Sequence, residues 1–502
     1  MTAMNSVPLG AAVSETHSGV VFFVGDRAYK MKKPVDLGFL DFTTRRARER
    51  ACHEEVRLNR RFSPDVYLGV ADVHDPAGAV CDHLVTMRRM PADRRLSTLL
   101  QDRAPVEDAL RATARLLAEW HARAPRGPRI SEQGTRDALL GRWAESFDQT
   151  RPFHGRSIDT SDALEIEERA RDFLAGRAPL FETRIAEGRV VDGHGDLLAG
   201  DVFCLDDGPR VLDCLEFDER LRFLDGLDDA AFLAMDLERL GAADLAERFA
   251  GWYAGFAGDP APSSLWHHYV AYRAFVRAKV ACFRHAQGDA AAAAEAGTLA
   301  EIALRHLRAG TVGLVLVGGL PGTGKSTLAG AMADRLGCTL LGSDRVRKEL
   351  AGLSPADSAA AAYGTGLYTA EWGERTYAEL VRRARRLLEL GETVVLDASW
   401  TSREDRDLAA DLAGDVRAEL HAIECRVPRS VAAERIRSRP RGPSDADPAI
   451  AALMAAAADP WPEATAVDTG GTLDGSVARA LAAVRPYGAE HVWHRRPRLA
   501  PD

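Results

Sequence analysis

The chain has 502 residues, a hydrophobic fraction of 46% and a formal net charge of −9. This length exceeds one ordinary domain, and the apolar content is enough for two or three packed cores. The acidic balance argues against general binding to nucleic acid. No apolar run is long enough to span a membrane, and the N-terminus lacks the basic start and sustained apolar core of a signal peptide.

The cysteines indicate the redox environment of the protein. Seven are scattered along the chain, and none belongs to a Cys-x-x-Cys pair. This pattern argues for reduced thiols and against a disulfide framework or a zinc site. We therefore expect a cytoplasmic protein whose partners include neither a membrane nor nucleic acid.

The N-terminal region has the pattern of a small α+β lobe. Residues 20–35 read as a β-hairpin, and a highly charged helix is expected from about Thr43 to Phe62. Two further strand-like runs follow at 66–73 and 79–87. The middle of the chain is mainly helical in pattern, over 96–124, 136–180 and 228–308. A strand at 190–196 and a hairpin at 202–215 interrupt it.

A domain boundary is expected at 309–311, because strands and helices alternate beyond it. The strand-like runs there are 314–317, 339–341, 393–396 and 419–425. This order is typical of βαβ units around a parallel sheet. The expected organisation is an α+β domain over 1–308, an α/β domain over 311–490 and a basic tail over 491–502.

The most specific motif in the chain is a glycine-rich turn between the 314–317 strand and the next helix. Gly319 to Ser326 fit the P-loop pattern G-x-x-x-x-G-K-[ST]. In such a loop the backbone N–H groups and the helix N-terminus face phosphate oxygens, Lys325 reaches the β- and γ-phosphates, and the Ser326 hydroxyl binds Mg²⁺. We assign nucleotide binding to Gly319, Leu320, Pro321, Gly322, Thr323, Gly324, Lys325, Ser326 and Thr327.

Three further features of the second half suit phosphoryl transfer. Asp344 follows the second strand and is a candidate to orient an acceptor hydroxyl, with a plain helix N-cap as the alternative. Asp397 ends the Val-Val-Leu-Asp strand and is a candidate Mg²⁺ ligand, with a strand-end turn residue as the alternative. Arg435 and Arg439 share a helical face and are candidates for a lid over the phosphates, with a solvated charged face as the alternative.

These features resemble the small P-loop kinases of the nucleoside- and gluconate-kinase type, over roughly residues 311–485. The resemblance implies a transferase, since the chain lacks the Walker-B acidic pair that motor ATPases use.

The first half contains a second arrangement suited to phosphoryl transfer. Asp196 lies in a His-Gly-Asp-Leu motif after a strand, Asp201 follows five residues later, and Asp213 ends another strand. The spacing matches a kinase catalytic loop, in which the first Asp contacts the acceptor hydroxyl and the other two positions bind Mg²⁺. Carboxylate oxygens are the ligands that Mg²⁺ prefers.

A lysine on the N-terminal hairpin would complete this arrangement. Lys30 and Lys32 lie on the same face of the second strand. Either lysine is a candidate for the α- and β-phosphates, and Glu54 or Glu55 on the next helix is a candidate to hold it. Lys30 is the first choice, because Ala28 precedes it as in Val-Ala-Ile-Lys.

Residues 1 to about 308 resemble the aminoglycoside phosphotransferase branch of the protein-kinase-like fold, and the joined chain resembles proteins in which this domain is fused to a P-loop kinase. The resemblance implies a bilobal kinase-like domain followed by a P-loop domain. Three departures stand out: Asp201 replaces the usual Asn, Leu198 replaces a frequent His, and no G-x-G-x-x-G loop is present. Residues 15–19 would have to cover the phosphates instead.

The sequence therefore predicts an ATP- and Mg²⁺-dependent phosphotransferase that acts on a hydroxyl group of a small molecule and has two nucleotide sites. The alternative is one catalytic kinase domain that a non-catalytic, ligand-binding domain regulates. A protein kinase is disfavoured, because no Ala-Pro-Glu segment follows Asp213.

Overall fold

The computed structural model describes residues 12–15, 19–36, 41–354, 357, 365–438 and 447–484. The chain divides into two compact units. The first comprises Met1–Asp159, Thr183–Pro260 and Tyr269–Ala303, and the second comprises Thr160–Glu182, Ala261–His268 and Leu304–Asp502. Two short segments that precede residue 309 therefore pack with the C-terminal part of the chain. The predicted basic tail, 491–502, lies outside the described residues.

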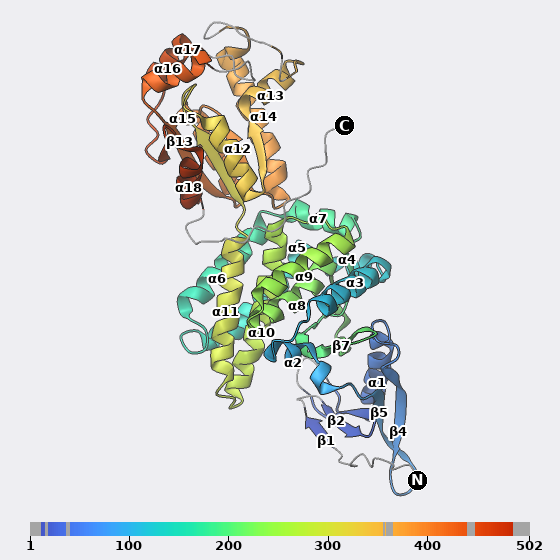
Figure 1. Cartoon of the computed structure of the whole chain (residues 1–502). Coiled ribbons are helices and arrows are strands. Elements are labelled where there is room, and N and C mark those ends of the chain that lie inside the picture. Colours follow the sequence, from blue (N-terminus) through green and yellow to red (C-terminus); the bar gives the residue numbers. More distant parts are fainter. Residues whose placement is uncertain are drawn as a thin grey trace, which may run out of the picture. The chain divides into compact units, whose positions relative to one another are not determined.

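An antiparallel sheet and one helix begin the first unit (Figure 1). The strand order is β1-β2-β3-β5-β4, with bounds Ala12–Glu15, Gly19–Val24, Arg27–Lys32, Val80–Arg88 and Tyr67–His74. Helix α1 (Arg45–Asn59) packs on this sheet through Cys52 and Val56, which join Val66 and Val85 in one core. Thr44 caps the helix, since its side chain accepts a hydrogen bond from the Ala47 N–H. The predicted α+β lobe is confirmed.

Helices dominate the rest of the first unit. It also contains two pairs of short antiparallel strands, β6–β9 and β7–β8, with loops between the strands. The pairs are β6 (Val190–Asp192) with β9 (Phe223–Asp225) and β7 (Val202–Leu205) with β8 (Gly208–Val211). The helices from α2 to α11 are Leu96–Gln101, Glu107–Arg123, Pro128–Glu132, Arg136–Thr150, Thr160–Ala175, Ala178–Ala186, Gly226–Arg239, Ala243–Ala257, Ser263–Ala286 and Ala292–Ala309. Of these, α6 belongs to the second unit, and α7, α10 and α11 are divided between the two units.

A five-stranded parallel sheet forms the centre of the second unit, in the order β11-β12-β10-β13-β14. The strands are β10 (Gly313–Gly318), β11 (Thr339–Gly342), β12 (Val394–Asp397), β13 (Glu419–Arg426) and β14 (Thr465–Asp468). Every residue of β10 is buried, as expected of a central strand covered on both faces. The helices from α12 to α18 are Lys325–Leu336, Ser343–Leu350, Ala370–Glu389, Arg403–Asp415, Arg429–Ser438, Pro448–Ala457 and Leu473–Val484. The predicted α/β class is confirmed.

Two edge strands, β1 and β14, were not predicted from the sequence. All four residues of β1 are exposed, and β14 buries only Val467. An edge strand with so little burial shows no apolar alternation, so its periodicity carries no signal.

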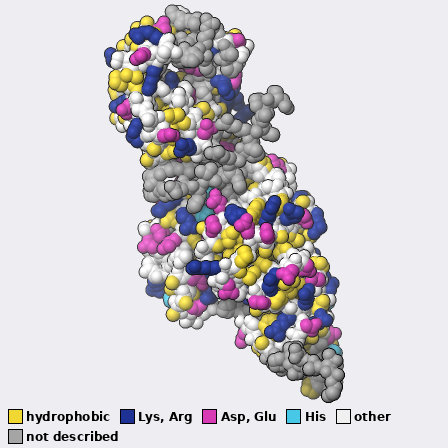
Figure 2. All heavy atoms as spheres, in the orientation of Figure 1, with side chains coloured by type: hydrophobic (Ala, Val, Ile, Leu, Met, Phe, Trp, Pro, Cys, Tyr) yellow, Lys and Arg dark blue, Asp and Glu magenta, His cyan; other side chains and the backbone are white. Residues whose placement is uncertain are grey.

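The surface mixes both signs of charge. On the face shown in Figure 2, basic and acidic side chains are interspersed over both units. Among the described residues, no helix combines the length and apolarity needed to cross a membrane.

Candidate functional site

The P-loop lies between β10 and α12, where backbone conformation and crowding both require glycine. Gly319, Gly322 and Gly324 have φ angles of 136°, 82° and 85°, a region that residues with a side chain rarely adopt. A Cβ at Gly322 would lie 2.4 Å from the Ala432 carbonyl oxygen, and one at Gly319 would lie 2.7 Å from Thr323 Oγ1. The backbone therefore runs where no side chain fits, which lets a ligand approach it closely, although the Gly319 and Thr323 N–H groups already donate to the Ser399 and Leu320 carbonyls.

Neighbouring segments hold this loop in place. Thr323 Oγ1 donates to the Leu320 carbonyl at 2.8 Å, and Thr469 Oγ1, beyond β14, donates to the Thr323 carbonyl at 2.5 Å. Helix α12 begins at Lys325, so its N-terminal N–H groups and positive dipole end face the loop. Pro321 and Thr323 are buried, whereas Ser326 and Thr327 are exposed in the first turn of the helix.

Asp397 lies at the end of the neighbouring strand and is suited to a cation. The β10–β12 register pairs Val317 with Asp397, so the carboxylate stands beside the start of the P-loop. Its Oδ1 atom is buried without a hydrogen-bond partner. Burial raises the pKa of this carboxyl, while the charge of Lys325 and a hydrogen bond from Ser326 act in the opposite direction. An unpartnered carboxylate oxygen next to a Ser hydroxyl fits Mg²⁺, which prefers oxygen ligands.

Asp344 stands at the same edge of the sheet. It lies in the first turn of α13, directly after β11, and the N-cap of that helix is Gly342 rather than Asp344. Arg347 Nη1 donates to Asp344 Oδ1 at 2.8 Å, and the Arg347 guanidinium lies 5.0 Å from the centre of the Tyr368 ring. The charge of Asp344 also raises the pKa of Asp397, so the two carboxylates are close enough to interact electrostatically.

One of the two predicted lid arginines lies beside the P-loop. Arg435 on α16 donates from Nη2 to the Thr469 carbonyl at 2.9 Å, and its Nη1 would lie 3.5 Å from a Cβ at Gly324. Arg439 lies outside the described residues. Arg435 thus has a fixed place next to the loop.

In the first unit, a cluster of buried charges connects β3 to α1. Glu55 has no exposed side-chain surface, and its two oxygens contact two lysines, with Lys30 Nζ at 2.9 Å from Oε1 and Lys32 Nζ at 2.5 Å from Oε2. Burial alone would raise the pKa of Glu55, but both lysines lower it. Glu54, the other candidate, instead pairs with Arg57 at the surface.

Asp213 joins this cluster from the segment after β8. Lys30 Nζ lies 2.5 Å from Asp213 Oδ1. Burial would raise the pKa of Asp213, but the charge and hydrogen bond of Lys30 hold it at about 2. The backbone of Asp213 is left-handed, with a φ of 65°, and its N–H donates to the Tyr67 hydroxyl at 3.1 Å. A strained non-glycine residue held by a buried tyrosine is a feature of functional positions.

The His-Gly-Asp loop is held by a carboxylate that sequence reasoning missed. Asp229, fully buried on α8, accepts hydrogen bonds from the N–H groups of His194 and Gly195 at 2.7 and 2.9 Å, and it lies 3.0 Å from His121 Nε2. The sequence presents Asp229 only as part of an acidic run that reads as a helix N-terminus. Its position inside the first turn of α8 was predictable, but its contact with a loop 34 residues earlier was not.

Asp196 and Asp201 lie in the segment that follows His194, and the charge of Asp196 acts on Asp201. Asp196 keeps 41% of its side chain exposed, and Arg277 Nη1 lies 3.9 Å from its Oδ1. Enclosure by the fold raises the pKa of Asp196. The pKa of Asp201 is raised further, by burial and then by the charges of Asp213 and Asp196. A divalent cation would stabilise carboxylates that repel one another in this way, and their oxygens are suitable ligands for it.

No group of three or more His, Cys, Asp or Glu side chains within the described ranges is preassembled to hold a metal ion. Of the proposed covering segment, Glu15 pairs with Lys33 at 2.6 Å, and 16–18 lie outside the described residues. The carboxylates described above are therefore candidate metal ligands without a completed ligand shell.

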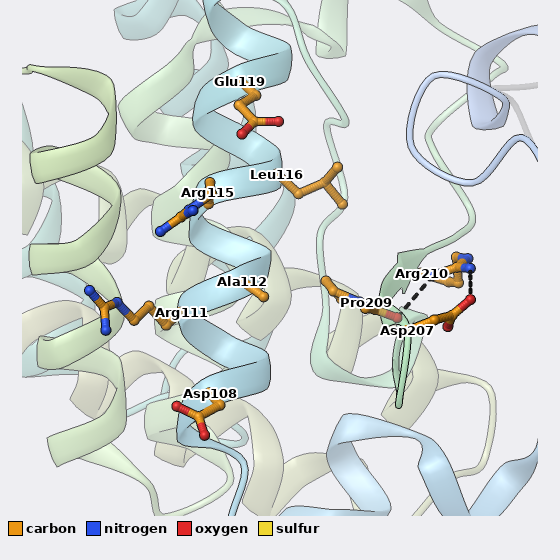
Figure 3. Close-up of a pocket in the computed structure, with 10 residues that line it drawn as sticks. Asp108, Arg111, Ala112, Arg115, Leu116, Glu119, Asp207, Pro209 and Arg210 are labelled. Atoms are coloured by element: carbon orange, nitrogen blue, oxygen red, sulfur yellow. Dashed lines mark hydrogen bonds and ion pairs between the residues drawn. The ribbon is translucent and has the colours of Figure 1, made fainter.

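A separate hollow of about 480 Å³ lies between α3 and the β7–β8 hairpin (Figure 3). Its lining comprises Asp108, Arg111, Ala112, Arg115, Leu116, Glu119, Asp207, Gly208, Pro209 and Arg210. None of these residues belongs to either candidate site.

One family model matches the part of the chain that contains the P-loop. Residues 314–460 match a family described as an AAA domain. Over its first part the chain is similar to an aminoglycoside 2′-phosphotransferase in its GDP complex, with 14% identity, a TM-score of 0.36 and coverage of 60% of this chain and 94% of that one. It is also similar to a sugar kinase from Janibacter sp. HTCC2649, with 18% identity, a TM-score of 0.28 and coverage of 34% and 94%.

A match over nearly the whole chain comes from mycobacteria. An uncharacterized protein of Mycobacterium tuberculosis is 43% identical over 482 residues, which cover 96% of this chain and 95% of that protein. Residues 314–460, which include the P-loop, match the AAA domain, and the chain as a whole belongs to the same family as this mycobacterial protein.

Proposed function

We propose that the protein is an ATP-dependent phosphotransferase with one nucleotide site in each unit, acting on hydroxyl groups of small molecules. The observation that carries the proposal is the group formed by the P-loop, Lys325, Ser326 and Asp397 at the carboxyl edge of the parallel sheet. Ligands bind at this edge in open α/β sheets. When bound, ATP supplies the γ-phosphate, and Mg²⁺ neutralises charge on the transferred group.

In the second unit, the loop N–H groups and Lys325 bind phosphate oxygens. Ser326 and Asp397 hold Mg²⁺. Asp344 orients the acceptor hydroxyl and accepts its proton, while the hydrogen bond from Arg347 holds the Asp344 side chain in place. Arg435 adds a positive charge beside the phosphates.

In the first unit, Lys30 binds phosphate oxygens and Glu55 holds Lys30. Asp196 accepts the proton of the acceptor hydroxyl, and Asp201 and Asp213 hold Mg²⁺. Arg277 and the loop contacts of Asp229 keep Asp196 in place. The support for this half is the meeting of Lys30, Glu55 and Asp213 from three separate segments.

A second candidate is that the first unit binds a nucleotide or other ligand without turnover and regulates the second. The direct pairing of Lys30 with Asp213 favours it, because a phosphate on Lys30 and a metal ion on Asp213 would each have to displace this ion pair. The two candidates differ in whether Asp196 is needed for turnover.

The test measures ATP consumption by the full chain against a panel of sugars, aminoglycosides and nucleosides. Lys325→Ala and Asp196→Ala are compared with Arg335→Ala, an exposed control on α12, and Asp206→Ala, an exposed control next to β7. We expect each site variant to abolish the activity of its own unit and each control to retain activity. If Asp196→Ala leaves every acceptor-dependent activity intact, the first unit is not a kinase. If neither site variant changes turnover, both assignments are wrong.

A further inference from the structure

The first unit contains a second buried lysine that a single-lysine nucleotide site does not require. Lys32 pairs with Glu55 at 2.5 Å and also with Glu216, which lies three residues after Asp213. Only 1% of the Lys32 side chain and 9% of the Glu216 side chain are exposed. Burying such a pair costs free energy that a pair of apolar residues would not, so the pair calls for an explanation.

A ligand from solvent can reach one of the two lysines but not the other. Lys30 is 13% exposed, and its partner Asp213 is 51% exposed, so this side of the cluster opens toward solvent. Lys32 lies at the closed side, between two buried carboxylates and 5.6 Å from the centre of the Phe42 ring. A phosphate can therefore approach Lys30 but not Lys32.

The charges explain why both lysines and Glu216 occur together. Alternation along β3 places Lys30 and Lys32 on the same face, where both contact Glu55. With two cations on its two oxygens, Glu55 cannot rotate away from Lys30. Asp213 pairs with Lys30 at the open side of the cluster, and Glu216 supplies the carboxylate that pairs with Lys32 at the closed side.

We propose that Lys32 and Glu216 are positioning residues, which hold Glu55 and through it Lys30 at the nucleotide site of the first unit without touching the nucleotide. This role rests on the proposed function of that unit. It assigns Lys32 a different task from Lys30, although the two residues are chemically identical and only two positions apart. It also ties the segment that carries Asp213 to the strand that carries Lys30.

The experiment measures the dissociation constant of MgATP by calorimetry in the full chain with Lys325→Ala, which silences the P-loop. In this background we compare Lys32→Met/Glu216→Gln with Arg48→Met/Asp82→Asn, another ion pair between α1 and the sheet, at 3.0 Å. Both double variants remove one positive and one negative charge together. We expect the first to raise the dissociation constant by about tenfold, the lower end of the loss found when an outer-shell partner of a metal-ligating residue is removed. The second lowers only the thermal midpoint.

The outcomes separate this proposal from the proposed function. If the Lys325→Ala protein binds no MgATP, the nucleotide site of the first unit and the positioning role fall together. If it binds MgATP and Lys30→Met abolishes that binding, but Lys32→Met/Glu216→Gln leaves it unchanged, the positioning role alone is wrong. Should the double variant not fold, Glu216→Asp, which withdraws the carboxylate by one methylene, takes its place. An unchanged dissociation constant in that variant overturns the positioning role as well.

Discussion

Replacing Gly322 by Ala tests whether the P-loop geometry is the basis of nucleotide binding in the second unit. The residue has a φ of 82°, and a left-handed conformation costs a non-glycine residue about 1–2 kcal/mol. The added Cβ would lie 2.4 Å from the Ala432 carbonyl oxygen, about 1 Å short of an ordinary contact. Ala432 belongs to α16, which also carries Arg435. The loop and this helix must therefore move apart.

A displacement of about 1 Å at a ligand-positioning group costs on the order of 100-fold in function. We therefore expect Gly322→Ala to weaken MgATP binding at the P-loop by about 100-fold, or about 2.7 kcal/mol. Calorimetry measures this in a Lys30→Met background, which removes the site of the first unit. Gly330→Ala is the matched control, because Gly330 lies inside α12 and no atom would lie within 4 Å of its Cβ. It should bind normally and gain about 0.5–1 kcal/mol of stability. Unchanged binding by Gly322→Ala would refute the crowding argument.

Three further predictions concern stability and the first unit. Gly176→Ala places a Cβ 2.0 Å from the Val416 carbonyl oxygen, so thermal unfolding should show the second unit destabilised by about 1–3 kcal/mol. The control Gly141→Ala, whose Cβ would have no atom within 4 Å, should not destabilise the protein. His268 is buried and stacked on Phe173 at 4.4 Å, and burial lowers its pKa to about 3. Below about pH 6.5 the His268 imidazole takes up a proton in the unfolded chain but not in the folded chain. The free energy of unfolding should therefore fall by about 1.4 kcal/mol per pH unit from pH 6.5 toward 3. Denaturant titrations of His268→Leu should lack this pH-dependent component. The Asp229 carboxylate accepts hydrogen bonds from two backbone N–H groups, and Asp229→Asn replaces it by an amide with one acceptor oxygen. This substitution should cost about 3 kcal/mol of stability and impair Asp196-dependent turnover. Turnover that survives intact would show that the loop does not need this anchor.

The choice between Glu54 and Glu55 shows where sequence reasoning stops. Adjacent helical residues point about 100° apart, so only one of the two can face the sheet. The packing of α1 through Cys52 and Val56 turns Glu55 inward and leaves Glu54 with Arg57 at the surface. The charged sequence of this helix has no clear apolar stripe from which its phase could be read.

The sequence by itself determined the P-loop, the parallel α/β class and the α+β lobe. Each depends on neighbouring residues: glycines where the backbone turns sharply, a lysine and a serine at a helix start, and the period of apolar positions. The tertiary structure alone decided the partners of the charged groups. Lys30 meets Asp213 across 183 positions and Lys32 meets Glu216 across 184, and nothing local distinguishes either lysine. Such pairs form only when separately folded segments pack, because burial makes each charge depend on a partner that the local sequence does not specify.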